Sequence, residues 1–135
     1  MKAILRSGFL ALAIMLALVV PVGQDEAESV KWYRMAAEQG DTKAQNKLGD
    51  IYYNGFGVLQ DYAKAAIWYR KAAEQGDADA QNKLALMHVK GDGVPQDYVS
   101  AQMWFNIAAA LGDEKAQKAR SMVVDLMTPD QITAA

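Results

Sequence analysis

The chain has 135 residues, a formal net charge of −2 at pH 7 and no cysteine. This length allows one small domain, and the absence of cysteine excludes a disulfide framework and a thiolate metal site. No basic stripe runs along the sequence, which argues against nucleic acid or an anionic membrane surface as the partner.

The N-terminal segment, residues 1–23, has the pattern of a secretion signal. Lys2 and Arg6 precede an unbroken apolar run from Gly8 to Val22. The alternative is an uncleaved inner-membrane anchor over residues 7–24, although a spanning helix needs about 20 apolar residues. The cleavage signal is poor, and no cysteine offers a lipoprotein anchor. We expect export, with a periplasmic or secreted location after cleavage.

The remaining residues, 24–135, carry a repeat of 36 residues. Residues 44–79 and 80–115 are two consecutive copies, identical at 17 of their 36 aligned positions. A half repeat, 25–43, precedes them, and residues 116–135 are expected to form a terminal helix and cap. A fixed period of this length indicates stacked supersecondary units and not one globular core.

Each copy predicts a pair of helices. In the first copy, apolar residues at helical spacing predict a helix over residues 44–54. Two glycines one residue apart then end that helix, because they can adopt positive φ angles. Asp61 is placed to cap a second helix over residues 62–75, and Asp97 has the same place in the next copy.

Residues that recur with the period are expected to build the core and the turns. The predicted core residues are Trp32, Leu48, Tyr52, Trp68, Tyr69, Leu84, Trp104 and Phe105. The predicted turn residues are Gly55, Gly57, Gly76, Gly91, Gly93 and Gly112. The repeated tryptophans could instead line a ligand box, but aromatic residues that recur on the same helix face as the alanines favour a core.

Both ends of the repeat region depart from the pattern. The half repeat supplies the counterpart of a second helix alone, starting at Asp25, and residues 116–127 predict one more first-type helix. Thr128 and Pro129 then have the pattern of an N-cap and a first helical residue. Because so short a stack buries few interfaces, we expect completion by a partner or by a homodimer.

The first full copy reads A-x-x-x-L-G-x-x-Y-x-x-G-x-G-V-x-x-D, followed by K-A-x-x-W-Y-x-x-A-A-x-x-G-D. This pattern resembles the Sel-one-like repeat, a relative of the tetratricopeptide repeat, and the resemblance covers residues 25–125. The second copy departs from it at Ala85, His88, Ser100 and Phe105. The resemblance implies an all-α fold, a right-handed α/α superhelix (solenoid) of 36-residue helix-turn-helix repeats, and a role in protein–protein contacts.

The sequence offers no catalytic or metal-binding constellation. The single histidine, His88, occupies the packing position of Tyr52, and no ligand stands at helical spacing from it. Asp61, Asp77, Asp97 and Asp113 are explained by helix capping. No phosphate loop is present, because no strand precedes Gly55. We therefore predict no enzyme activity, no metal site and no cofactor.

The resemblance places the first helices on the concave side of the superhelix. Helical phase puts one set of residues opposite the core arc of these helices. The candidate partner-binding residues on this face are Asn46, Asp50, Tyr53, Asn82, Leu86, Val89 and Met122. Side-chain amides can hydrogen-bond an extended peptide, and exposed apolar groups often mark interaction sites. The alternative is that neighbouring helices bury this face.

These patterns lead to two hypotheses about function. The first is a non-enzymatic protein or peptide interaction scaffold in the bacterial cell envelope, which binds through the face of the first helices. The second is a structural component that self-associates through its incomplete terminal repeats. Membrane contact is expected only if the N-terminal segment stays uncleaved, and no nucleic acid partner is expected.

Overall fold

The computed structural model describes residues 26–134, and every regular element in that range is an α-helix. The helices are α2 (Glu28–Glu38), α3 (Thr42–Asn54), α4 (Tyr62–Glu74), α5 (Ala78–Lys90), α6 (Tyr98–Ala110), α7 (Glu114–Val124) and α8 (Pro129–Ala134). The predicted signal, residues 1–23, lies outside the described residues. None of the helices in the described range is long and apolar enough to span a bilayer.

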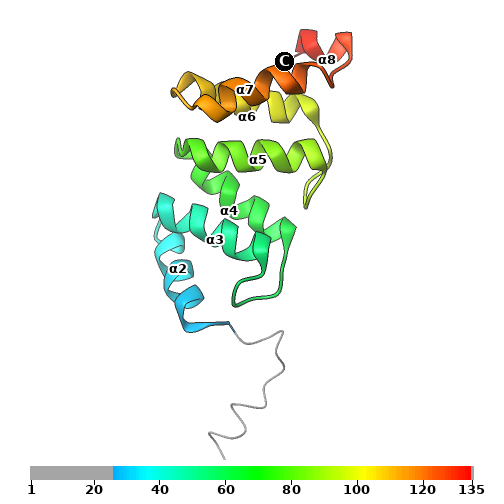
Figure 1. The fold of residues 1–135 in the computed structure, drawn as a ribbon. Helices are drawn as coiled ribbons and strands as arrows, with labels where there is room; N and C mark the ends of the chain where they lie inside the picture. Colours follow the sequence, from blue (N-terminus) through cyan, green and yellow to red (C-terminus); the bar gives the residue numbers. More distant parts are fainter. Residues whose placement is uncertain (1–25, 135) are drawn as a thin grey trace, which may run out of the picture.

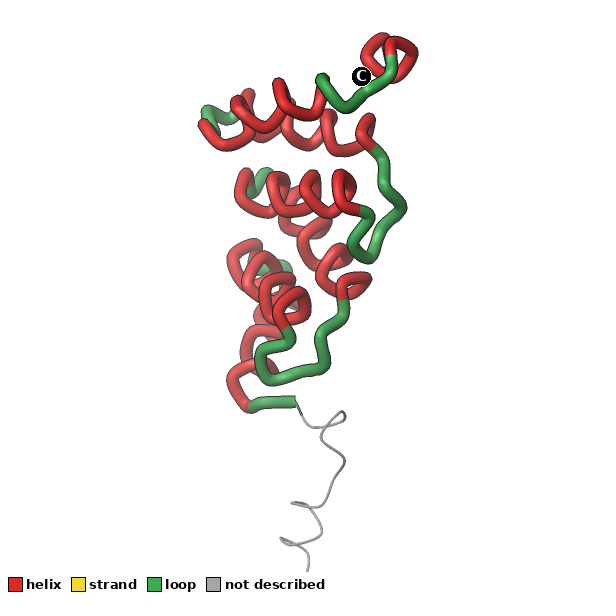
Figure 2. Tube along the Cα trace, turned by 45° about the vertical axis from the view of Figure 1, so that its right-hand side comes forward, coloured by secondary structure: helices red, strands yellow, loops and turns green. Residues whose placement is uncertain are grey.

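The helices form an elongated stack, in which each helix packs mainly on its neighbours in the sequence (Figures 1 and 2). α3 pairs with α4 and α5 with α6, which gives two complete helix pairs. α2 packs on α3, α4 on α5 and α6 on α7, and these contacts join one unit to the next. The prediction of an all-helical solenoid is confirmed.

Aspartates begin the helices of each unit at the predicted places. The carboxylates of Asp61 and Asp97 accept backbone N–H groups at the starts of α4 and α6. Asp77 and Asp113 do the same for α5 and α7, so these helices start about two residues earlier than the repeat boundaries suggest. An N-cap carboxylate satisfies backbone donors that have no intrahelical partner, and this fixes the start of the helix.

The C-terminal turn has the predicted capping pattern, although α7 is shorter than expected. α7 ends at Val124, not at residue 127. The Thr128 N–H donates to Gln131 Oε1 at 2.9 Å, and the Gln131 N–H donates to Thr128 Oγ1 at 3.3 Å. This reciprocal pair is a capping box, and it starts α8 with Pro129 at the first helical position.

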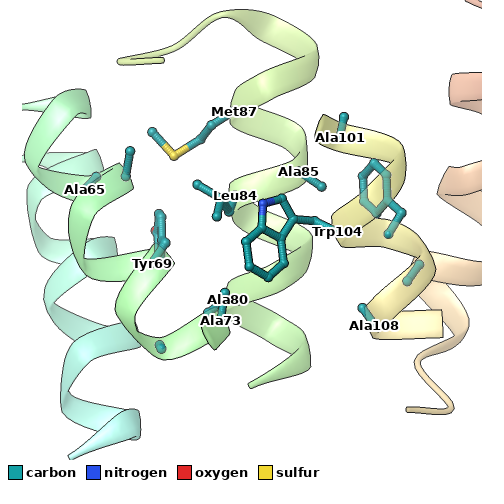
Figure 3. Packing of buried hydrophobic residues seen from close by; sticks show 14 of the residues in the cluster. Ala65, Tyr69, Ala73, Ala80, Leu84, Ala85, Met87, Ala101, Trp104 and Ala108 are labelled. Atoms are coloured by element: carbon teal, nitrogen blue, oxygen red, sulfur yellow. The ribbon is translucent and has the colours of Figure 1, made fainter. Parts of the chain in front are cut away.

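The core runs along the stack between the helix pairs. Leu48 and Leu84 are fully buried, and Tyr69, Trp104 and Phe105 are buried as predicted. Figure 3 shows Leu84 and Met87 of α5 on the side of α4, which carries Ala65 and Tyr69, and Ala85 on the side of α6. Small alanines at the crossing points let the helices approach closely, and the larger side chains fill the remaining space.

Two residues of the predicted core are less buried than expected. Trp68 is half-buried, and the prediction for Trp32 is wrong, because its side chain is 66% exposed. The equivalent residue of the last complete unit, Trp104, is buried and lies beside α5, the first helix of its pair (Figure 3). Within residues 26–134 no helix precedes α2, so α2 packs on α3 alone and leaves Trp32 open.

The turn after each first helix packs against the start of the second helix of the preceding unit. Gly57 and Gly93 have φ angles of +78° and +69°. A Cβ on Gly93 would overlap the backbone of Tyr62 and stand 2.6 Å from the Ala63 nitrogen, at the start of α4. Gly93 is therefore required both for its left-handed backbone and for the close approach of two units.

Candidate binding surface

A polar network joins the first complete unit to the second. The Asp50 carboxylate on α3 accepts a hydrogen bond from the Tyr69 hydroxyl on α4 at 2.6 Å. The same Oδ1 atom accepts from the Lys83 ammonium on α5 at 2.8 Å, and Lys83 also contacts Asp79 Oδ2 at 2.7 Å. One carboxylate thus holds together side chains from three helices.

The surroundings of Tyr69 and Lys83 preserve the ordinary charge states of these two side chains. Burial is the main cause that raises the pKa of Tyr69, and the hydrogen bond to Asp50 raises it further, so the hydroxyl stays a donor. Burial alone would lower the pKa of Lys83, but Asp50 and Asp79 outweigh it and raise this pKa. The network is therefore a structural ion pair, in which the Tyr69 hydroxyl and the Lys83 ammonium keep their protons near neutral pH.

Tyr53 extends this polar surface toward the turn of the next unit. Its hydroxyl donates to Asp92 Oδ2 at 3.1 Å, across 39 residues of sequence. Its ring packs on Tyr62 with a centroid distance of 4.8 Å. Burial raises the pKa of Tyr53, and Asp92 adds to the effect. The side chain is half-buried, so one part of the ring faces solvent.

A hollow of about 260 Å³ opens where α3, α4 and α5 meet. Its lining combines carboxylate, ammonium, phenol and aliphatic groups. The lining residues are Asp50, Tyr53, Asn54, Tyr69, Lys83, Leu86, Met87 and Lys90. Leu86 is the exposed apolar group of the set, at 45% exposure. We call this place the α3–α5 hollow.

The predicted face is divided between this hollow and the junctions between units. Asp50, Tyr53 and Leu86 line the hollow together. Val89 is half-buried against the core, and Met122 is exposed on α7, outside the hollow. Only three of the seven predicted residues therefore line this hollow.

Asn46 and Asn82 require a correction, because their amides do not face a free groove. The Asn46 Nδ2 atom donates to Asp79 at 2.8 Å, and the Asn82 Nδ2 atom donates to Asp113 at 2.9 Å. Asn82 is 8% exposed. Both amides connect successive units, and neighbouring elements bury Asn82 but leave Asn46 half-buried.

Five residues of the hollow were not among the predicted binding residues: Asn54, Tyr69, Lys83, Met87 and Lys90. A signal for part of this set was present. One period after Asp50, Tyr69 and Lys83 stand Leu86, Phe105 and Ala119, so all three polar residues are replaced by apolar ones together. A joint replacement of this kind indicates residues in mutual contact.

Glutamines were a second missed feature of the junctions. Gln45 and Gln81 are buried and donate from Nε2 to the carbonyl oxygens of Ala37 and Ala73, at 3.1 and 3.0 Å. Gln117 makes the same contact with Ala109 at 3.4 Å. Their spacing of 36 residues was visible in the sequence. Each glutamine ties a first helix to the end of the preceding second helix.

His88 takes the packing position that the repeat predicts. It is buried, and its Nδ1 atom lies 3.4 Å from the Pro95 carbonyl oxygen. In the part of the chain that the structure describes, no group of three or more His, Asp or Glu side chains is placed to hold a metal ion.

The family model of the Sel1 repeat matches three consecutive segments, residues 11–41, 42–77 and 78–113. The chain belongs to the Sel1 repeat family. The model sets the repeat boundaries two residues before those inferred from sequence identity. Its first match includes residues 11–23, which the sequence reading assigned to an export signal and which lie outside the described residues.

Solved structures of three bacterial proteins share the fold. A protective antigen present in uropathogenic Escherichia coli strains, with an SLR fold, has a TM-score of 0.74 and 39% identity over 77% of this chain and 22% of its own. A Sel1 repeat protein from Oxalobacter formigenes has a TM-score of 0.67 and 41% identity, over 69% and 38% of the two chains. Helicobacter pylori cysteine-rich protein B has a TM-score of 0.64 and 32% identity, over 67% and 68%.

This Sel1 repeat chain thus spans less than two-fifths of the length of the first two relatives. A comparison with curated protein sequences gave no match. Repeat proteins of this fold generally mediate protein–protein interactions. The Sel1 family is a family of interaction scaffolds, which agrees with a role in binding.

Proposed function

We propose that this Sel1 repeat protein is a non-enzymatic scaffold of the bacterial cell envelope that binds a protein or peptide segment. The binding site is the α3–α5 hollow, and Tyr53 and Leu86 provide its apolar contacts. The observation that carries the proposal is the hollow itself, because it joins an exposed leucine to polar groups that hydrogen bonds between three helices hold in place.

The size and lining of the hollow favour a peptide side chain over a cofactor. Pockets for small molecules usually have volumes of about 300–1,000 Å³, and this one is smaller, at about 260 Å³. One apolar side chain of a partner could pack on Leu86 and Tyr53. Lys90, at the exposed rim, could then pair with an acidic residue beside it.

The envelope location rests on the N-terminal sequence. Residues 1–23 have the charge and hydropathy pattern of an export signal, and one structural relative is a protective antigen. Cleavage would give a periplasmic or secreted protein, and an uncleaved segment would anchor it at the inner membrane. N-terminal sequencing of the protein from the cell decides between these outcomes.

Site-specific photocrosslinking in cells tests the binding site. A crosslinking amino acid replaces Leu86 in one strain and Ile67 in another. Ile67 is a matched control, because it is an exposed apolar residue on α4 that does not line the hollow. We expect a discrete crosslinked protein from position 86 alone, and loss of that product when Tyr53→Glu is added. Equal products from both positions would refute the proposed site.

A second candidate function is self-association through the ends of the stack. The exposed Trp32 on α2 and the exposed Leu126 and Ile132 near the C-terminus favour it. Sedimentation of the full chain would then show a defined dimer, and Trp32→Glu would return it to the monomer. A monomer over the whole concentration range would exclude this candidate.

A further inference from the structure

A second hollow lies at the α2 end of the stack. Figure 1 shows α2 as the first of the described helices, with α3 on one side of it and no described helix beyond it. It measures about 480 Å³ and is separate from the α3–α5 hollow. Its lining residues are Trp32, Tyr33, Ala36, Asp41, Lys43, Ala44 and Lys47. We call it the α2 end hollow.

The next unit shows which residues occupy the equivalent site when a helix covers it. One period later, Tyr69 and Lys83 occupy the positions of Tyr33 and Lys47, and α3 covers them. The exposed fraction of the tyrosine falls from 39% at Tyr33 to 3% at Tyr69. The covering helix supplies Asp50, which accepts from both the tyrosine hydroxyl and the lysine ammonium.

The α2 end hollow keeps the two donors but, within residues 26–134, it has no equivalent of Asp50. Lys47 makes no ion pair in that range, and the position of Asp79 is taken by a second lysine, Lys43. The end therefore presents two ammonium groups and a phenol hydroxyl beside an exposed tryptophan, and the one carboxylate of the lining, Asp41, caps α3 by accepting from the Ala44 N–H. This charge pattern is complementary to an acidic group.

At the next junction, the two hydrogen-bond donors are absent where the acceptor is absent. Where Asp50 is replaced by Leu86, the tyrosine and the lysine are also replaced, by Phe105 and Ala119. The chain thus loses the donors when the acceptor is lost. At the α2 end both donors remain, whereas the period places Ile14 at the acceptor position of this chain's own first unit.

We propose that the α2 end hollow binds an acidic amphipathic helix of another protein, which takes the place that α3 has on α4. The docked helix carries an aspartate or glutamate that accepts from Tyr33 and Lys47. The residue before the acid must be small, because a Cβ on Gly49 would stand 2.5 Å from the Tyr69 ring. A leucine before that residue matches the fully buried Leu48.

A second copy of this chain fits the hollow less well. α7, the last first-type helix, has Arg120, Ser121 and Met122 at the positions of Leu48, Gly49 and Asp50. It would bring an arginine to a buried site and no acceptor for the two donors. This mismatch favours a partner of different sequence.

A labelled peptide with the sequence of residues 41–61 of this chain serves as the probe, since it contains the Leu-Gly-Asp pattern. Its binding to the full chain is followed by fluorescence anisotropy. We expect saturable binding, and binding about tenfold weaker for the peptide with Asp50→Asn, because a hydrogen bond to a charged group is lost. The chain with Lys47→Glu should lose binding and regain it for the peptide with Asp50→Lys.

Two variants of the chain serve as controls for the specificity of peptide binding. Lys118→Glu changes an exposed lysine on α7, at the far end, and should leave binding unchanged. Leu86→Glu changes the α3–α5 hollow and should also leave it unchanged, so this result is independent of the function proposed above. Equal binding of the Asp and Asn peptides, or no binding of either, would overturn the proposal.

A crosslinking amino acid in place of Trp32, in the full chain without peptide, checks the other occupants. A product that joins position 32 to residues 1–25 would show that the chain's own N-terminal segment fills the hollow. A product that joins two chains would show a second copy there. Either product would overturn the proposal, and an uncrosslinked chain that binds the peptide would support it.

Discussion

The tightest contact between units predicts a large penalty for one added methyl group. Gly93 has a φ of +69°, and a non-glycine residue in this left-handed region costs about 1–2 kcal/mol. A Cβ there would also overlap the backbone of Tyr62, which cannot move without shifting α4. Overpacking of this kind costs about 1–3 kcal/mol. Gly93→Ala should therefore lower the free energy of unfolding by about 2–5 kcal/mol in total.

Gly91 is a matched control in the same turn. Its φ is +76°, but the nearest atom to an added Cβ, the Cβ of Gln96, is 3.4 Å away, which is an ordinary contact. Gly91→Ala should therefore cost only the backbone term, about 1–2 kcal/mol. Urea unfolding followed by far-UV circular dichroism gives both values. If the two variants lose the same stability, the close approach of the units at Gly93 contributes nothing and the reasoning is refuted.

Two further predictions concern the junction network and the helix caps. Asp50→Leu, Tyr69→Phe and Lys83→Ala should together cost less than the sum of the single changes, by about 0.5–3 kcal/mol, and additive losses in urea unfolding would contradict this. A hydrogen bond from Ser100 lowers the pKa of Asp97, and one from the Ala116 N–H lowers that of Asp113. The stability that both caps contribute is complete above the unfolded pKa of about 3.9, and it is lost as pH falls through the lower pKa values of the folded state. The double variant Asp97→Asn with Asp113→Asn should therefore show a smaller fall in the free energy of unfolding at acid pH.

Much of the fold could be predicted from the sequence, because its determinants are local. Helix starts follow from carboxylates such as Asp61 and Asp97, and helix ends follow from glycines such as Gly55, whose φ is +74°. These signals act within one turn of helix, so they can be read without knowledge of the tertiary structure. The period of 36 residues then predicts the stack.

The candidate site was harder to predict, because the face of a helix does not reveal which neighbour it meets. Helical phase correctly placed Asn46 and Asn82 away from the core of their own pair, but the next unit uses that face for hydrogen bonds. The prediction that Trp32 is buried failed for the opposite reason. A repeated position is buried only where both neighbouring helices are present, and α2 lacks one of them in the described range.

The polar junction through Asp50 and the apolar one through Leu86 make the units unequal building blocks for a longer array. A tandem duplication of residues 42–77 would rebuild the contacts of Asp50, since the new Lys47 would meet the existing Asp50 and Tyr69, although Lys43 would stand in the place of Asp79. A duplication of residues 78–113 would instead place a second Lys83 against Leu86 and Phe105. Duplication of the first complete unit should therefore be tolerated when such an array becomes longer, and duplication of the second should be selected against.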